Sequence, residues 1–448
     1  MTSRRRLLIC TRATNPEGGA DRIIADLARE LPARGWDVQI AAAHGAQHNR
    51  VERYRAAYPD LPVVALDAAL GTRASRVRAV RRAVQRFKPD VVLAMRLHDV
   101  FEAVAGLKSA VSGPRLAMGL RAFEAEYFND LEAWKGQIDL CVTSGELIAE
   151  TCRRLGVIEP TRVMSIGGGV HPPRAPAPPR TPRVPLRLLY CGRFDPQQKR
   201  VLDLVPYVEA LKALDLPFEL ELAGSGPAEG ELRKRLQPMI ESGQVRMLGW
   251  CSQPALYEQV YPRADVFVHF AAWEGMTIAP REAMAHGVVP VISDFPGRRY
   301  ERQFVEGETA LSFPIGDAQA AAHATRRLAA EPGLLQRLSR GAICSQQGKY
   351  SYAGSIEAWV QALDGCLQMP TVTGPMPQPR ERLHGRLARW GLSESAQDAL
   401  RRVLQRPVRH ASPGSEWPSS GRRATLDEIG RYRALASAIE SEAQTSAE

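Results

Sequence analysis

Two carboxylates carry most of the chemistry that this sequence can support. Glu274 and Glu282 stand eight positions apart in WEGMTIAPREAMAHG, residues 273–287. The preceding run ADVFVHF is short, apolar and rich in Val and Phe, which predicts a buried strand, and Pro280 begins a predicted helix that ends at Gly287. We therefore expect Glu274 at the carboxyl end of a strand, where open α/β sheets bind ligands, and Glu282 inside the next helix.

The loop between these carboxylates favours anion binding. Gly275 allows a ligand to approach the backbone closely, and the amides of Met276, Thr277 and Ile278 are expected to point outward at the start of the helix. Surface carboxylates are usually only solvated, so the spacing by itself does not establish a site. Two acceptor carboxylates beside an anion site suit a ligand that carries both hydroxyls and phosphates.

A pair of basic residues follows another predicted strand. In LLYCGRFDPQQKRVLDL, residues 188–204, Arg193 and Lys199 are six positions apart. Arginine offers a planar fork and lysine a mobile point charge, a combination that can hold a diphosphate. The alternative is a solvated basic loop.

These segments resemble the retaining glycosyltransferases of family 4, the group 1 nucleotide-sugar transferases of GT-B fold. The resemblance rests on WEG with a second Glu eight residues after the first, and on the GR loop that contains Arg193 and Lys199. ELAGSGPAEGELRK, which contains Gly224, resembles a further turn of the family, and LLICTRATNPEGGADR, with Gly18 and Gly19, resembles its first strand and loop. The similarity extends from about residue 6 to about residue 368.

The resemblance implies a role for each of these residues. Arg193 and Lys199 would grip the donor diphosphate and, with Glu274 at the donor sugar, serve catalysis. Glu282 would accept hydrogen bonds from the ribose. The remaining donor-binding positions would be Gly224, Gly275, Met276, Thr277 and Ile278. The family transfers sugars with retention of configuration and without a bound metal or other cofactor.

The first half departs from the family pattern. Relatives carry a His after the fifth strand, where this chain reads MGLRAFEAE, with Arg121 nearby. His98 and Asp99 follow the predicted strand DVVLAM and are the nearest candidates to touch an acceptor, although a structural His at a strand end is the competing interpretation. Gly18 and Gly19 would reach phosphate or acceptor, or form a plain tight turn. Arg200 replaces a frequent Gly.

Length and pattern predict two domains and an appendage. Strand and helix patterns alternate in both halves of the 448 residues, which implies two parallel sheets covered on both faces. Between them, residues 171–185 contain seven prolines in fifteen positions and predict an extended connector. The expected fold is α/β, a GT-B pair of Rossmann-like domains that face a cleft, with an arginine-rich C-terminal extension. The expected boundaries are 1–170 for the acceptor-side domain, 171–185 for the linker, 186–350 for the nucleotide-sugar domain, 351–369 for a helix crossing back, and 370–448 for a basic extension that is helical or partly disordered.

The amino-acid composition limits the class of protein, its cellular compartment and its partners. With 44% apolar and 24% charged residues the chain has an ordinary soluble composition, no apolar run approaches the length of a bilayer span, and the apolar stretch in MTSRRRLLIC is too short for a signal peptide. The seven cysteines lack paired ligand spacing, which predicts reduced thiols in the cytoplasm and no metal site. The basic runs lack interleaved aromatics, so we expect no nucleic-acid partner.

The net charge of +10 leaves phosphate-bearing partners and anionic lipid open. Residues 71–90 carry six arginines and one lysine, with no acid before Asp90, and the tail is also rich in arginine. One interpretation is peripheral attachment to the inner face of the cytoplasmic membrane, and the other is a solvated helix face with a partly disordered tail.

Three functions fit these observations. The first is a glycosyltransferase that moves a hexose from a nucleotide diphosphate sugar to a saccharide or lipid-linked acceptor, in cell-surface polysaccharide or lipopolysaccharide assembly. The alternatives are a nucleotide-sugar epimerase and a non-catalytic GT-B sugar-binding or scaffold protein. The order of cations, carboxylates and turn glycines over about 360 residues favours the first. The sequence does not determine the donor, the acceptor or the oligomeric state.

Overall fold

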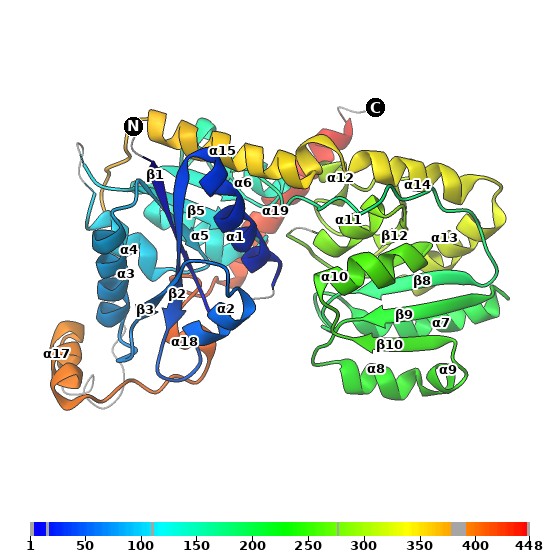
Figure 1. The fold of residues 1–448 in the computed structure, drawn as a ribbon, viewed down its shortest axis with the longest axis horizontal. Coiled ribbons are helices and arrows are strands. Elements are labelled where there is room, and N and C mark those ends of the chain that lie inside the picture. Colours follow the sequence, from blue (N-terminus) through cyan, green and yellow to red (C-terminus); the bar gives the residue numbers. More distant parts are fainter. Residues whose placement is uncertain (1–3, 15–17, 109–111, 276, 378–390, 446–448) are drawn as a thin grey trace. The chain divides into compact units, whose positions relative to one another are not determined.

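The computed structural model describes residues 4–14, 18–108, 112–275, 277–377 and 391–445. These residues form two compact units. The first unit comprises Met1–Ser144, Ile148–Ile166 and Ile356–Ala434, and the second comprises Gly145–Leu147, Gly167–Ser355 and Leu435–Glu448. Each unit contains one sheet (Figure 1). Each also has its own hydrophobic core.

The sheet of the first unit has seven parallel strands in the order β3-β2-β1-β4-β5-β6-β7. Its central strands are buried on both faces because helices cover the sheet, as expected for continuous apolar runs. The strands are β1 Arg5–Thr11, β2 Trp36–His44, β3 Val63–Asp67, β4 Val91–Met95, β5 Arg115–Leu120, β6 Leu140–Thr143 and β7 Val163–Ser165. The helices between them are α1 Gly19–Glu30, α2 Val51–Ala57, α3 Arg73–Phe87, α4 Asp99–Ala105, α5 Ala125–Trp134 and α6 Glu146–Leu155.

The second unit repeats the design with six parallel strands in the order β10-β9-β8-β11-β12-β13. The strands are β8 Leu186–Cys191, β9 Phe218–Ala223, β10 Val245–Gly249, β11 Val266–His269, β12 Val289–Ser293 and β13 Leu311–Phe313. The helices are α7 Leu204–Ala213, α8 Glu229–Arg235, α9 Gln237–Glu241, α10 Gln253–Ala255, α11 Ile278–Ala285, α12 Arg298–Glu301, α13 Ala318–Ala330 and α14 Leu334–Ser345. These two sheets confirm the prediction of two Rossmann-like parallel-sheet domains.

In both sheets the strand order reverses beside the first strand of the unit. The neighbours β1 and β4 flank this point in the first unit, and β8 and β11 flank it in the second. Loops that leave the carboxyl ends of such neighbouring strands diverge to opposite faces of the sheet and leave room for a ligand. Residues that follow these four strands are therefore the first candidates for function.

The proline-rich stretch, residues 171–185, contains no helix or sheet strand and packs against the second unit. The Arg180 side chain is buried and donates hydrogen bonds to the carbonyl oxygens of Pro262, Tyr261 and His286 at 2.9, 3.2 and 2.9 Å. Prolines lack a backbone N–H, so this stretch has few backbone donors. The guanidinium group of Arg180 anchors it to the second unit by donating to three carbonyl oxygens.

Two helices contribute residues to both units. They are α15 Tyr352–Gln368 and the last helix, α19 Leu426–Thr445. The remaining helices among the described residues of the C-terminal region are α17 Glu394–Leu404 and α18 Pro413–Glu416, both in the first unit.

The described part of the C-terminal region is built into the first unit. Trp417 is fully buried in its core, and Tyr432 is 1% exposed there. The carboxylate of Glu416 accepts hydrogen bonds from the backbone amides of Gln47, His48 and Asn49 at 2.8, 2.9 and 2.7 Å. A detached tail would not bury a Trp and an ionised Glu, so residues 391–434 are a structural part of this domain. Residues 378–390 of the predicted basic extension lie outside the described residues.

Acidic residues of α17 pair with arginines of α3. Asp398 forms ion pairs with Arg78 at 2.7 Å and with Arg402 at 2.8 Å, and Glu394 pairs with Arg73 at 3.0 Å. Residues 71–90 therefore carry less free basic charge than their sequence predicts, because these ion pairs neutralise part of it. No helix among the described residues has both the length and the apolar character needed to cross a bilayer.

Candidate donor and acceptor sites

In the second unit, the loops after β8 and β11 bring charged side chains together. The loop after β8 contains Arg193 and Lys199, and the loop after β11 contains Glu274. The ammonium group of Lys199 forms an ion pair with Oε1 of Glu274. Nε2 of His269, the last residue of β11, lies 3.0 Å from the same oxygen. The point where the strand order reverses thus holds a cation, a carboxylate and an imidazole.

This cluster is almost closed to solvent. The side chains of Glu274, His269 and Lys199 are 5%, 3% and 19% exposed. Burial by itself would raise the pKa of Glu274, but the charge of Lys199 and the hydrogen bond from His269 outweigh burial and lower that pKa to about 2. Burial lowers the pKa of His269 against the opposing effect of Glu274. The cluster therefore holds an ionised carboxylate and a neutral imidazole near neutral pH, with Lys199 paired to the carboxylate.

Arg193 lies in the same loop but remains open. Its side chain is 58% exposed, and it contacts Oδ2 of Asp195 at 3.6 Å. Its guanidinium group also donates to Oε1 of Gln198 at 2.7 Å, and Gln198 donates in turn to the carbonyl oxygen of Trp273 at 3.3 Å. The basic loop after β8 is therefore linked directly to the segment that carries Glu274, and Arg193 is accessible to a ligand.

Glu282 occupies a different position from Glu274. It lies in α11, is 2% exposed, and its Oε2 accepts a hydrogen bond of 2.9 Å from the hydroxyl of Tyr261. Helix α11 begins at Ile278, preceded by Thr277, whose side chain is 5% exposed and does not cap the helix. The first amides of α11 are therefore uncapped by a side chain, as an anion site at a helix start requires. Met276 lies outside the described residues.

Two backbone positions shape the loops around the cluster. Gly224 has φ +144°, and a Cβ there would clash with the carbonyl oxygen of Gly192, so the close approach of the turns after β8 and β9 demands glycine. Arg200 has φ +47°, the left-handed conformation that glycine adopts without cost, which is consistent with the Gly frequent at this position in the resembled family. Its side chain pairs with Asp203 at 2.7 Å.

The predicted acceptor residues of the first unit fall into two groups. Gly18 directly precedes α1, and Gly19 is its first residue. Arg121 follows β5 and is 8% exposed, and its guanidinium group donates to the carbonyl oxygens of Thr143 and Ile166 at 3.3 and 2.9 Å. These residues lie at or beside the carboxyl ends of the first sheet's strands.

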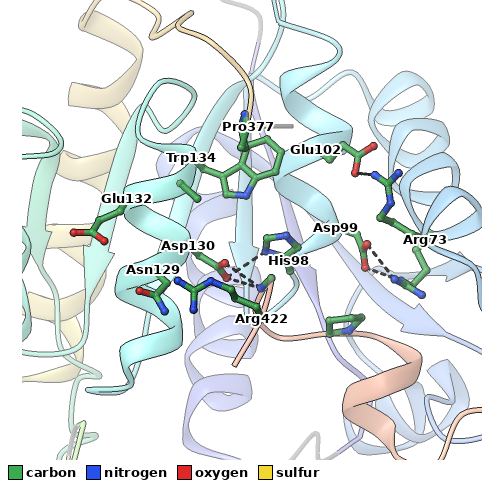
Figure 2. A pocket seen from close by; sticks show the side chains of 14 residues that line it. Arg73, His98, Asp99, Glu102, Asn129, Asp130, Glu132, Trp134, Pro377 and Arg422 are labelled. Atoms are coloured by element: carbon green, nitrogen blue, oxygen red, sulfur yellow. Dashed lines mark hydrogen bonds and ion pairs between the residues drawn. The ribbon is translucent and has the colours of Figure 1, made fainter. Parts of the chain in front are cut away.

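His98 and Asp99 instead line a cavity of about 490 Å³ in the first unit (Figure 2). Asp99 forms a buried ion pair with Arg76 at 2.6 Å, and both side chains are 3% exposed. Nδ1 of His98 lies 3.2 Å from Oδ2 of Asp130, beneath Trp134. Because the carboxylate of Asp99 is already paired with Arg76, we interpret Asp99 as part of a structural ion pair.

Several residues of these sites were not predicted from the sequence. His269 and Tyr261 support the two carboxylates, and Arg12 and Arg96 lie at the edge of the first sheet that carries Arg121. His269 ends a strand, and Arg12 and Arg96 each follow one directly, so a search for polar residues at predicted strand ends finds all three. Tyr261 offers no such signal. Among the described residues, no group of three or more His, Cys, Asp or Glu side chains could hold a metal ion.

Comparison with known families matches both halves of the chain. Residues 17–174 match the family described as Glycosyltransferase Family 4, and residues 185–331 match Glycosyl transferases group 1. The lipopolysaccharide core biosynthesis glycosyltransferase LpsE of Rhizobium meliloti is 26% identical over 363 residues, which covers 78% of this chain and 96% of the relative. The GDP-mannose:cellobiosyl-diphosphopolyprenol alpha-mannosyltransferase of Xanthomonas campestris is 26% identical over 221 residues, 48% of this chain and 56% of the relative.

Solved structures agree on the fold. The Anabaena protein Alr3699/HepE, crystallised with UDP and glucose, superposes with a TM-score of 0.62 at 14% identity, and covers 80% of this chain and 99% of its own. An identity this low supports the fold alone. The two parallel-sheet domains described above have the GT-B fold.

Proposed function

Because the chain belongs to glycosyltransferase family 4, we propose that it transfers a hexose from a nucleotide diphosphate sugar to a saccharide or lipid-linked acceptor, with retention of configuration. The supporting observation is the ion pair of Lys199 and Glu274, with exposed Arg193 in the same loop, at the carboxyl edge of the second sheet. This edge is where an open α/β sheet binds its ligand.

The donor would be held by groups of opposite charge. Arg193, Lys199 and the first amides of α11 would bind the diphosphate and stabilise the negative charge that develops on it as the glycosidic bond breaks. These fixed positive groups would take the place of a metal ion. Glu274 would accept hydrogen bonds from the sugar hydroxyls, which requires Lys199 to share its charge between Glu274 and the diphosphate.

Glu282 would bind the ribose hydroxyls. Its present contact with Tyr261 uses Oε2 and holds the carboxylate in one orientation. Since the side chain is 2% exposed, ribose binding requires the groups that cover Glu282 to move. Retention would follow from attack by the acceptor on the face of the sugar from which the diphosphate departs, assisted by that diphosphate.

The acceptor proposed here is a precursor of a cell-surface saccharide. Support comes from the relatives, one of which is named for lipopolysaccharide core biosynthesis and the other for transfer to a diphosphopolyprenol-linked cellobiosyl group. Such acceptors are anchored in lipid, so we propose that the enzyme works in the cytoplasm at the inner membrane face.

A surface on α17 could attach the enzyme to that face. Val403 and Leu404 are 81% and 54% exposed and are flanked by Arg401 and Arg406. Exposed apolar side chains beside basic ones suit insertion into an anionic interface, where each basic residue contributes about 1 kcal/mol. We propose this surface as the main membrane contact in place of residues 71–90, where Arg78 is paired with Asp398.

A donor screen tests the proposed activity. The purified full chain is incubated with a panel of UDP- and GDP-hexoses, and release of nucleoside diphosphate is measured with and without saccharide acceptors. We expect release with one donor and its loss in Glu274→Ala. Conversion of the donor sugar without release would indicate an epimerase, and binding of a donor without turnover would indicate a sugar-binding protein.

A further inference from the structure

Three arginines follow three neighbouring strands of the first sheet. Arg12 follows β1, Arg96 follows β4 and Arg121 follows β5, and these strands are adjacent in the sheet. The strand order reverses between β1 and β4, the same relative position that holds Lys199 and Glu274 in the second unit. We call Arg12, Arg96 and Arg121 the arginine cluster.

Each member of the arginine cluster has a buried nitrogen without a hydrogen-bond partner in the described part of the chain. The atoms are Nε of Arg12, Nε of Arg96 and Nη2 of Arg121. Arg121 as a whole residue is 8% exposed and therefore more than nine-tenths buried. Buried donors are nearly always paired in folded proteins, and an unpaired donor next to a charge is costly. Three such donors at one sheet edge indicate a missing acceptor.

The charges around the cluster also favour an anion. Burial and, as the second cause, the charge of Arg96 together lower the pKa of Arg121 to about 10. The pKa of Arg12 is lowered first by burial and then by Arg96, and these effects exceed the opposing ones of Tyr127 and Asp21. The positive charges of the arginine cluster therefore repel one another, and the neighbouring groups do not fully compensate this repulsion.

Two acids, Asp21 and Glu124, lie near this edge of the sheet, but neither pairs with Arg12 or Arg121. Asp21 pairs with Arg96 at 2.6 Å and accepts a hydrogen bond of 3.2 Å from the hydroxyl of Thr11. The pKa of Glu124 is raised by desolvation and by Glu126, and lowered by Arg96. Neither acid reaches the unpaired nitrogens of Arg12 and Arg121.

The backbone of Arg96 supports the same conclusion. Its φ is +57°, a left-handed conformation that costs a residue with a side chain about 1–2 kcal/mol. Residues held in such conformations cluster at ligand-binding positions. Here the conformation places the guanidinium group beside Asp21 and within electrostatic reach of Arg12 and Arg121.

We propose that the arginine cluster binds an oxyanion of the acceptor. Guanidinium forks match the oxygens of a phosphate or a carboxylate, and α1, which begins beside the cluster at Gly19 without a side-chain cap, adds a favourable dipole. The oxyanion is either a phosphate of a lipid-linked or phosphorylated saccharide or the carboxylate of an acidic sugar. The assignment of the anion to the acceptor rests on the proposed transferase function, whereas the anion site itself does not.

Calorimetry of the full chain with pyrophosphate tests this site. Parent protein should bind pyrophosphate at two places, the proposed donor site and the arginine cluster. Arg12→Gln should weaken only the second, by about 10-fold or more, because it removes charge-assisted hydrogen bonds. Arg193→Ala should weaken only the first. Arg53→Gln, which alters an exposed arginine on α2, is the matched control and should bind as the parent does.

A parallel titration with glucuronate distinguishes the two sources of oxyanion. Stronger binding of pyrophosphate at the cluster identifies a phosphate-bearing acceptor, and stronger binding of glucuronate identifies an acidic sugar. Arg12→Lys, which keeps the charge and loses the fork, should bind with intermediate affinity and serves if Arg12→Gln does not fold. Affinities for both probes that equal those of the parent in the Arg12 variants would overturn the proposal. If Arg193→Ala were the only variant to lose pyrophosphate binding, the result would support the donor site and reject the arginine cluster as an anion site.

Discussion

The ammonium group of Lys199 and the carboxylate of Glu274 form a buried ion pair, although 75 residues separate them in the sequence. The two residues come from loops after β8 and β11, the strands between which the order of the second sheet reverses. In the proposed reaction this pair meets the diphosphate on one side and the sugar on the other.

Arg193→Ala should weaken binding of the donor's nucleoside diphosphate by about 10-fold to 150-fold, because one charge-assisted contact is lost. The side chain is 58% exposed, so folding should be unaffected. Arg187→Ala is the matched control, since Arg187 is an exposed arginine at the amino end of the same strand, β8. Calorimetry with the diphosphate that the donor screen identifies gives the affinities. Equal affinity in Arg193→Ala and Arg187→Ala would contradict the diphosphate assignment.

Lys199→Met should destabilise the protein by about 3–5 kcal/mol, because it leaves Glu274 charged and buried without its cation. The double variant Lys199→Met/Glu274→Gln should recover much of this loss. Urea unfolding of the parent, both single variants and the double variant measures the coupling. Additive effects in this cycle would show that the two side chains do not form the pair described.

Stability of the second unit should depend on pH through Glu274. Its pKa is lowered from 4.5 to about 2 in the folded protein, so its ionised form contributes about 3 kcal/mol above pH 4.5. This contribution should fall as the pH drops from about 4.5 to about 2. Glu274→Gln has no group to titrate, so the difference in unfolding free energy between parent and variant should shrink over this range. A constant difference between pH 5 and pH 2 would be incompatible with the lowered pKa.

Glu282→Gln should reduce affinity for the nucleoside diphosphate, while Glu274→Ala should mainly slow transfer, on the order of 100-fold, because the sugar is misplaced. Tyr261→Phe should have an intermediate effect on affinity, since it removes the hydrogen bond that orients Glu282. Tyr257→Phe, which alters a neighbouring tyrosine, is the control. Parent-like turnover in Glu274→Ala would remove Glu274 from the reaction.

Activity should survive a chelator, because Arg193 and Lys199 are proposed to balance the charge of the diphosphate. The donor is assayed in the presence of excess EDTA and then with added manganese or magnesium. Complete loss with EDTA and recovery with either metal would refute the metal-free mechanism.

Liposomes with anionic lipid should sediment the protein at low salt, and neutral ones should not. Val403→Glu/Leu404→Glu should abolish this binding, because it places charges on the exposed apolar surface of α17. Leu426→Glu is the matched control, since Leu426 is 86% exposed elsewhere in the first unit. Equal sedimentation of both variants would exclude α17 as the membrane contact.

The sequence by itself determined the fold class and the order of the elements. Short apolar runs that alternate with helical patterns are local signals, so the two parallel sheets could be predicted without knowledge of contacts. Glu274, Lys199 and Arg193 could also be located at strand ends, because a motif ties residue type to position. These predictions needed only local periodicity and a resemblance that extends along most of the chain.

Only the tertiary structure decided which side chains meet. The joining of Lys199 to Glu274 with His269, the pairing of Asp99 with Arg76, and the convergence of Arg12, Arg96 and Arg121 depend on strand order, which local patterns do not encode. The incorporation of Trp417 and Glu416 into the first unit likewise arises from contacts more than 300 residues apart in the sequence. An arginine-rich segment predicts a free basic surface from the sequence alone. The structure shows that acids distant in the sequence, such as Asp398, neutralise part of this charge.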